Sequence, residues 1–406
     1  MSFTQGEQWQ LIPAATYCAS VRDGTHDSPK FTDTGFPLVT SKNIKMGQIE
    51  LDSANLVSEA DFTDINRRSK VDRWDVLFSM IGTVGEVCLV QDEEPSFAIK
   101  NIGLFKCGDE MKGRWLYYWF TNPATKAAMR QANRGASQQF IPLGALRALQ
   151  ILVPTSQSLK RRIIGILSTY DDLIENNRRR MALLEESARL LYREWFVRLR
   201  FPGYEHTLIA DGVPQGWERK TLAQLTSFLK RGITPTYDDE AEGLVVNQKC
   251  IRDGRVNLEL ARNQSKEVKP ERVLQIGDVL VNSTGEGTLG RVAQVKVSLV
   301  NCTVDTHVTI VRPNESVGRH YFGQAVMDWE PRFSTMGKGA TNQTELSPAA
   351  IGETAILVPP HTLLEQFETF AEPVYEQVTN LTQQNQKLRV ARDLLLPRLM
   401  SGELAV

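Results

Sequence analysis

Two loops carry polar side chains of the kinds that can hydrogen-bond to the edges of nucleic-acid bases. The first is Gly135-Ala136-Ser137-Gln138-Gln139, and the second is Gly339-Ala340-Thr341-Asn342-Gln343, which follows Lys338. Asn and Gln can bond an adenine through two hydrogen bonds, and a lysine can bond a guanine. The side chains differ between the loops, as two different target sequences would require. Ordinary drift of an unimportant loop would give the same difference.

A basic stripe leads into the first loop. Its three members recur every fourth residue and so share one helix face: Lys126, Arg130 and Arg134. Asn122 as N-cap, Pro123 in the first turn and Gly135 after the last turn predict the bounds of that helix. The stripe could hold phosphates while the loop contacts bases, but a solvated basic face would have the same pattern.

Other candidates for DNA contact follow predicted strands or lie in predicted hairpin turns: Lys42, Thr83, Lys249, Arg252, Thr284 and Thr288. The segment Gly285-Glu286-Gly287-Thr288-Leu289-Gly290 also matches the G-x-G-x-x-G pattern of dinucleotide-binding proteins. That pattern requires a helix directly after it, whose N-terminus holds the pyrophosphate. Because residues 291–295 alternate as a strand does, we expect a tight hairpin here and no nucleotide site.

Motifs for catalysis are absent from the sequence. It has no Asn/Asp-Pro-Pro-aromatic motif for amino-methyl transfer and no G-x-x-x-x-G-K-[ST] phosphate loop. The five histidines form no metal-spaced pair, and we expect His307 to lie in a strand with a role in the core. We therefore predict no catalytic, cofactor-binding or metal-binding residues. A nuclease built from scattered carboxylates and a lysine would leave little trace in one sequence, so an enzyme remains an alternative.

Composition indicates an ordinary globular protein. Of 406 residues, 41% are hydrophobic and 23% are charged, and the five cysteines include no C-x-x-C pair. The net charge of −1 argues against a protein that coats nucleic acid without selectivity. We expect no membrane association and no signal peptide, and therefore a cytoplasmic location. The length favours two domains.

An internal repeat sets the expected architecture. The tetrapeptide Ile151-Leu152-Val153-Pro154 recurs unchanged as Ile356-Leu357-Val358-Pro359, each time before a long helical pattern. Upstream matches keep the same order and include the two polar loops, the segments Asp75-Val76-Leu77 and Asp278-Val279-Leu280, and the segments Lys42-x-Ile44-x-x-Gly47 and Lys249-x-Ile251-x-x-Gly254. Glycine-punctuated β-rich runs over residues 76–90 and 279–297 predict hairpins, so each copy should be a mixed domain.

Two long helices are expected after the two copies, from Lys160 to Trp195 and from Leu364 to Leu399, because apolar residues step by threes and fours there. Each would span on the order of 50 Å. Pro373 should kink or interrupt the second helix. We expect the helices to pack against each other, antiparallel, as spacers. The alternative is two unrelated helices, each packed on its own domain.

The predicted fold is therefore α+β, with two homologous mixed α/β domains related by pseudo-two-fold symmetry and separated by two long antiparallel coiled-coil-like helices. The first domain is expected over residues 1–158 and the first helix over residues 159–198. The second domain is expected over residues 199–361, and the second helix with the C-terminal tail over residues 362–406.

The sequence resembles the specificity subunits of type I restriction-modification systems. The resemblance rests on the duplication, on the run Ile166-Leu167-Ser168-Thr169-Tyr170-Asp171-Asp172-Leu173-Ile174-Glu175-Asn176-Asn177, on Glu194-Trp195-Phe196, and on residues 394–404. It implies two target-recognition domains, each binding half of a bipartite site in double-stranded DNA. It implies helices that set the spacing and dock two methyltransferase subunits, with restriction subunits in the larger complex. S-adenosylmethionine, ATP and Mg would then belong to the partner subunits, and this chain would bind no cofactor.

Two other functions remain open at this stage. One is an internally duplicated nuclease or modification enzyme that acts alone. The other is a helical scaffold that joins two protein partners without DNA. Strong salt dependence of binding to a bipartite duplex would exclude the scaffold, because phosphate contacts release counterions.

Overall fold

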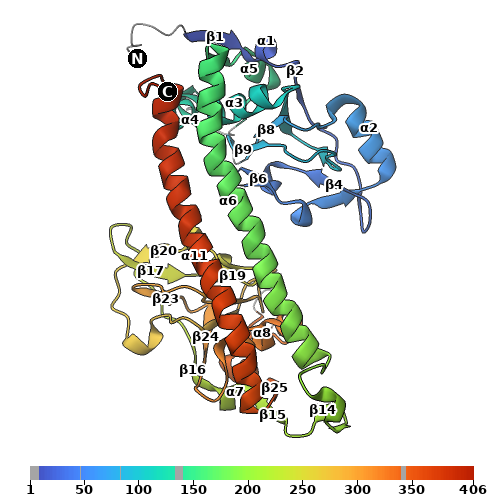
Figure 1. The fold of residues 1–406 in the computed structure, drawn as a ribbon, viewed down its shortest axis with the longest axis vertical. Coiled ribbons are helices and arrows are strands. Elements are labelled where there is room, and N and C mark those ends of the chain that lie inside the picture. The colour runs from blue at the N-terminus through green and yellow to red at the C-terminus, as the bar shows by residue number, and fades with distance from the viewer. Residues whose placement is uncertain (1–8, 46, 83, 133–139, 340–343) are drawn as a thin grey trace. The chain divides into compact units, whose positions relative to one another are not determined.

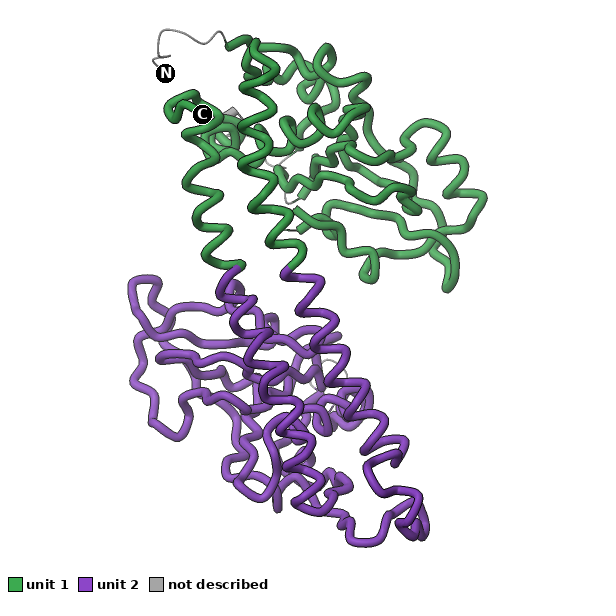
Figure 2. Tube along the Cα trace, viewed as in Figure 1, with its two compact units in different colours: residues 1–176, 385–406 green, residues 177–384 purple. Residues whose placement is uncertain are grey.

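Two long helices connect the β-rich parts of the chain: α6 (Gln157–Tyr192) and α11 (His361–Met400) (Figure 1). The computed structural model describes residues 9–45, 47–82, 84–132, 140–339 and 344–406. The chain forms two compact units, unit 1 with residues 1–176 and 385–406, and unit 2 with residues 177–384 (Figure 2). Each long helix thus contributes one part to each unit. Both units combine helices with small sheets, which confirms the predicted α+β class.

Unit 1 is built around two four-stranded sheets. The first has the order β2 (Ser20–Asp23), β11 (Ile102–Lys106), β8 (Val76–Ser79) and β9 (Val87–Leu89) and is antiparallel throughout. The second has the order β10 (Ala98–Ile99), β4 (Phe36–Val39), β7 (Asn55–Val57) and β3 (Phe31–Thr32). Strands β8 and β9 form the hairpin predicted from the glycines between them.

Smaller elements complete unit 1. They are the strand pair β1 (Trp9–Pro13) and β12 (Gln150–Pro154), the short pair β5 (Ile44–Lys45) and β6 (Gln48–Ile49), and the helices α1 (Ala14–Tyr17), α2 (Glu59–Ser69), α3 (Glu110–Thr121), α4 (Pro123–Ala132) and α5 (Leu143–Ala148). Helix α4 begins as predicted, because Asn122 Oδ1 accepts a hydrogen bond from Ala124 N at 2.9 Å.

Unit 2 repeats this arrangement. Its four-stranded antiparallel sheet has the order β16 (Thr226–Arg231), β24 (Val308–Pro313), β21 (Val279–Asn282) and β22 (Val292–Gln294). A second sheet has the order β20 (Arg262–Gln264), β17 (Gly243–Val246) and β23 (Cys302–Val304). The hairpin of β21 and β22 is the second one that the sequence predicted.

The remaining elements of unit 2 are short. They are the strand pairs β13 (Ile209–Ala210) with β14 (Val213–Pro214), β15 (Glu218–Thr221) with β25 (Ala355–Val358) and β18 (Ile251–Arg252) with β19 (Arg255–Val256), and the helices α7 (Leu222–Leu225), α8 (Arg319–Met327), α9 (Glu330–Phe333) and α10 (Pro348–Gly352).

The sequence repeat coincides with equivalent structure in the two units. Asp75 and Asp278 each precede the first hairpin strand, and each carboxylate accepts a hydrogen bond at 2.8 Å from the backbone N–H three residues earlier. Each also pairs with a basic residue of the neighbouring strand, Lys106 at 2.6 Å and Arg312 at 2.7 Å. The repeated Ile-Leu-Val-Pro segments lie in β12 and β25, just before α6 and α11.

The long helices pack against each other within each unit. In unit 1, Asp171 of α6 pairs with Arg392 of α11 at 2.5 Å, and Asn385 Nδ2 donates to Ile174 O at 3.2 Å. In unit 2, Thr382 of α11 contacts Met181 of α6, with 3.3 Å from Oγ1 to Sδ. Because residue numbers rise along one helix as they fall along the other, the pair is antiparallel, as predicted.

Pro373 does not interrupt α11, which is helical through this position. The predicted interruption is therefore wrong, and the alternative, a kink at this residue, stays a prediction. The proline removes the N–H that would bond Thr369 O, and both residues are exposed, so water can hydrate that carbonyl. On the opposite face, Phe367, Ala371 and Tyr375 are buried in the core of unit 2. Packing on that face therefore holds the helix together across the proline.

Within the described ranges, each helix is either too short or too polar to span a lipid bilayer.

Candidate nucleic-acid interface

Three segments singled out in the sequence converge at one end of the sheet in unit 2. The turn of the β21–β22 hairpin forms a backbone bridge from Thr284 to Glu345, and Leu346 N donates to Ser283 O at 2.9 Å. Lys338 and Glu345 exchange two backbone hydrogen bonds of 3.0 Å each, so Lys338 lies beside the same turn. We call residues 248–252, 283–291, His307, Lys338, Gly339 and Glu345 the hairpin edge of unit 2, since Ser283 N donates to His307 O at 2.8 Å.

The 3-10 turn η5 (Gln248–Cys250) completes this edge. It follows β17 and ends in β18, and its N-cap Asn247 accepts from Lys249 N at 2.9 Å. The buried Asn282 ties the turn to the hairpin, since its Nδ2 donates to Gln248 O at 3.0 Å and to Thr288 O at 3.1 Å. Lys249 directly follows Gln248, and Arg252 lies in β18; both are exposed, as phosphate contacts would require.

The glycine-rich turn is a hairpin and not a nucleotide-binding loop. Gly285, Gly287 and Gly290 all have positive φ angles, and strand β22 follows them in place of a helix. A Cβ atom at position 290 would lie 2.3 Å from Ser334 N, so the backbone of this turn packs closely on the chain after α9. The sequence-based choice of a hairpin is confirmed.

Polar side chains line the turn. Thr284 Oγ1 lies 2.7 Å from His307 Nδ1, and Thr288 Oγ1 donates to Thr284 O at 3.4 Å. Arg231, which the sequence did not single out, pairs with Glu345 at 2.6 Å. The hairpin edge therefore mixes fixed hydrogen-bonding groups with exposed cations.

His307 is not where the sequence placed it. It lies exposed between β23 and β24 and does not belong to the core. The reason is the preceding Asp305, whose carboxylate accepts from His307 N at 2.9 Å and whose carbonyl accepts from Val308 N at 3.2 Å. These bonds form an Asx turn that ends one strand and begins the next.

Unit 1 has a corresponding hairpin edge, formed by residues 41–45, 80–82, Asn101, Phe140 and Ile141; Asn101 precedes Ile102, which pairs with Ser79. Ile81 forms a backbone bridge with Phe140, and Ile141 N donates to Met80 O at 3.1 Å. The 3-10 turn η1 (Ser41–Asn43) lies close by, since a Cβ atom at Gly82 would be 3.8 Å from Ser41 Oγ. Lys42 is exposed on that turn, as Lys249 is on η5.

The other predicted residues have different outcomes. Lys126 and Arg130 lie on α4, where Lys126 is half-buried and Arg130 is exposed. Outside the described residues lie Thr83, Arg134, Gly135, Ser137, Gln138, Gln139, Thr341, Asn342 and Gln343. Their contribution to DNA binding remains a prediction.

The sequence also did not single out a group of three polar side chains in unit 1. His26 Nδ1 lies 2.7 Å from Asn101 Oδ1, and His26 Nε2 lies 3.0 Å from Asp23 Oδ2. Asn101 directly precedes β11, and His307 directly precedes β24. Extending the sequence repeat through these strands would have aligned the two residues.

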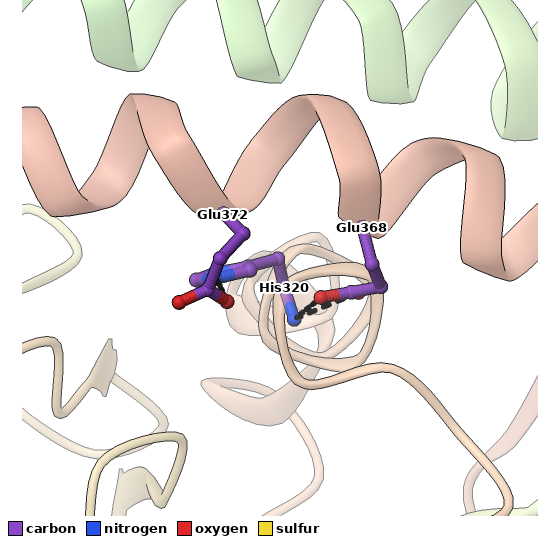
Figure 3. A group of neighbouring side chains, drawn as sticks. All are labelled: His320, Glu368 and Glu372. Carbon is purple, nitrogen blue, oxygen red and sulfur yellow. Dashed lines mark hydrogen bonds and ion pairs between the residues drawn. The ribbon is translucent and has the colours of Figure 1, made fainter.

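One group among the described residues has the composition of a metal site: His320, Glu368 and Glu372 (Figure 3). Glu368 of α11 accepts hydrogen bonds from the backbone N–H groups of His320 at 3.0 Å and Tyr321 at 2.9 Å, and so caps α8. Glu372 lies 3.0 Å from His320 Nε2 and pairs with Arg319. Because both carboxylates already have donors and a guanidinium is present, the group is a clamp between α8 and α11.

The chain is similar in sequence to two curated proteins. The MjaIX type I restriction enzyme specificity subunit of Methanocaldococcus jannaschii is 24% identical over 311 residues, which cover 73% of this chain and 70% of that protein. The HindI specificity subunit of Haemophilus influenzae is 21% identical over 336 residues, which cover 65% of this chain and 71% of that protein. No protein-family model matches the chain.

The fold is also found in a solved structure. The type I restriction-modification S subunit of M. genitalium superposes with a TM-score of 0.56 and 15% identity, over 98% of both chains. Similarity in sequence covers 73% of the chain, and similarity in fold covers 98% of it. The chain is therefore similar, in sequence and in fold, to specificity subunits of type I restriction-modification systems.

Proposed function

We propose that this chain is the subunit that determines DNA sequence specificity in a type I restriction-modification complex. Each unit binds one half of a bipartite site in double-stranded DNA through its hairpin edge. One observation carries the proposal: the two hairpin edges have the same backbone frame and different polar side chains. Equivalent frames with different side chains are what two half-sites of different sequence require.

Phosphate and base contacts are divided among the residues of each edge. The exposed lysines Lys42, Lys249 and Lys338 supply phosphate contacts, which give affinity and register. Polar side chains of the hairpin turns and of the loops that follow supply base contacts. The net charge of −1 keeps binding to unrelated DNA weak. Base contacts therefore make a large share of the difference in affinity between the target site and unrelated DNA.

The long helices determine the distance between the half-sites and dock the partner subunits. A continuous helix of 36 residues, such as α6, is about 54 Å long. Large apolar side chains are exposed on the helices in both units, Leu183 and Leu190 in unit 2 and Val390 and Leu394 in unit 1. Exposed apolar groups of this kind suit protein partners. We assign them to the two methyltransferase subunits, with restriction subunits joining the larger complex.

The chain itself carries out no chemistry in this proposal. S-adenosylmethionine, ATP and Mg bind to the partner subunits. The catalytic groups for methyl transfer and for cleavage belong to those subunits as well.

The test is to express the chain together with its partner methyltransferase and to map methylated adenines in the host DNA. We expect one bipartite sequence with two different half-sites and a gap of fixed length. Purified chain without partners should neither methylate nor cut DNA, with or without added Mg. Methylation that follows no bipartite sequence, or metal-dependent cleavage by the purified chain, would contradict the proposal.

A further inference from the structure

Asn101 and His307 occupy the same position in the two units. The next residue in each case begins the central strand of the four-stranded sheet, and its pairing is equivalent: Ile102 pairs with Ser79, and Val308 pairs with Asn282. The backbone carbonyls of Ile102 and Val308 accept from Gly24 N at 2.9 Å and Gly232 N at 3.1 Å. The backbones of Asn101 and His307 therefore lie at equivalent places in the two sheets.

In unit 2 this position is His307, and a neighbouring side chain fixes the orientation of its imidazole ring. His307 Nδ1 lies 2.7 Å from Thr284 Oγ1, in the hairpin turn, and the backbone of His307 is fixed by the Asp305 carboxylate. Among the described residues, His307 Nε2 has no hydrogen-bond partner, and the side chain is exposed. One nitrogen thus fixes the ring, and the other is available to a ligand.

In unit 1 this position is Asn101, and a neighbouring side chain fixes the orientation of its amide group. Asn101 Oδ1 lies 2.7 Å from His26 Nδ1, and His26 is fixed in turn by Asp23, at 3.0 Å from Nε2 to Oδ2. The Asp23 carboxylate is also paired with Arg68. No hydrogen bond joins Asn101 Nδ2 to any described residue, so its two N–H donors remain available.

The surroundings in unit 2 suit contact with a DNA base. The His307–Thr284 pair lies on the hairpin edge that also carries the exposed Lys249 and Lys338. Those lysines would hold the phosphates on either side. A side chain that is oriented by its neighbours loses little conformational entropy on binding, which favours precise recognition.

We propose that this position, His307 in unit 2 and Asn101 in unit 1, contacts a base edge and determines one base of each half-site. The inference rests on the proposed DNA-binding function. In the tautomer in which Nδ1 accepts from the Thr284 hydroxyl, Nε2 carries the ring proton and can donate it to an acceptor in the major groove. Asn101 Nδ2 is likewise a donor. The ligand in both cases is an acceptor on a base edge, such as purine N7 or guanine O6.

The experiment uses the chain assembled with its methyltransferase and a library of duplexes in which both half-sites are randomised. Selection is compared for the native chain, His307→Ala, Asn101→Ala and Lys249→Ala. We expect His307→Ala to relax one base position of one half-site by on the order of 10-fold and to leave the other half-site unchanged. Asn101→Ala should do the same in the other half-site. Lys249→Ala should weaken binding of all sequences alike.

His307→Gln is the second variant, because its amide keeps a donor near the position of Nε2. It should retain part of the base preference that His307→Ala loses. Unchanged selection by His307→Ala and Asn101→Ala, or an equal loss across all sequences, would overturn the inference. So would a lowered melting temperature of His307→Ala with its base preference intact. If the native complex selects no bipartite sequence, the proposed function fails before any variant is compared, so the two failures are distinguishable.

Discussion

Single polar residues attach α11 to each unit, and the two units use different chemistry for this purpose. In unit 1, Asp171 of α6 accepts from Tyr118 Oη at 2.7 Å and pairs with Arg392 of α11. In unit 2, the clamp of His320, Glu368 and Glu372 joins α8 to α11. The second contact contains a buried imidazole.

His320 should make unit 2 sensitive to acid. Burial lowers the pKa of His320 to about 4, against the opposing effect of the Glu372 carboxylate, so the ring is neutral at pH 7. An unfolded histidine titrates near pH 6.5. Between these values the unfolded chain binds more protons than the folded chain, so stability is lost as the pH falls from about 6.5 to about 4.

The measurement is urea unfolding of the whole chain at pH 7 and pH 5. His320→Gln removes the titrating group, and we expect it to reduce the difference in unfolding free energy between the two pH values. His206→Gln, at an exposed histidine in the same unit, is the matched control and should leave the difference as in the native chain. An undiminished difference in His320→Gln would contradict this explanation.

At the scale of elements, the hairpin turns depend on glycine. Gly290 and Gly287 both have positive φ, at 79° and 69°. A Cβ atom at Gly290 would lie 2.3 Å from Ser334 N, whereas one at Gly287 would have no atom within 4 Å. A side chain at either position would therefore cost conformational strain. Only a side chain at Gly290 would also clash with neighbouring backbone.

Gly290→Ala should destabilise the chain more than Gly287→Ala does. Each substitution carries a conformational cost of about 1 to 2 kcal/mol, and only Gly290→Ala also forces the backbone after α9 to move. The free energies of unfolding of both variants and of the native chain, from denaturant titration, give the comparison. Equal losses would mean that the turn does not pack on the chain near Ser334 as described.

The sequence predicted the regular helices and strands correctly. It failed where packing or a side-chain hydrogen bond changes the local structure. The repeat and the glycine spacing predicted both hairpins, and the periodic apolar residues predicted the helices. The interruption predicted at Pro373 does not occur, because packing of Phe367 and Tyr375 on the other face outweighs one lost hydrogen bond. His307 was misplaced because an Asx turn at Asp305 splits an apparently continuous strand. The partners of Asn101 and His307 lie far along the chain, so no local pattern revealed them.

At the scale of the whole molecule, the proposed function makes the long helices a ruler. Seven additional helical residues lengthen a helix by about 10 Å, close to three base-pair steps of DNA, and preserve the face that packs. Seven residues inserted before Asn177 of α6 and seven before Asn385 of α11 should therefore widen the gap between half-sites by about three base pairs.

Mapping methylated adenines with this double insertion is the direct measurement, and both half-sites should keep their sequences. The single insertion in α6 is the control, because it changes one helix without its antiparallel partner and should disrupt assembly or methylation. A double insertion that alters a half-site and leaves the gap unchanged would rule out the ruler.

Unit 1 is formed by two segments that are far apart in the chain, residues 1–176 and 385–406, and this affects how it folds during synthesis. Leu396, Leu399 and Met400 are fully buried in its core beside residues from the first 170 positions. During translation the core of unit 1 must wait for these last residues, on the order of ten to forty seconds after α6 has emerged. Unit 2 is contiguous in the chain and can close first. A ribosome that stops early would thus leave an open apolar surface in unit 1, of the kind that makes incomplete chains prone to aggregation.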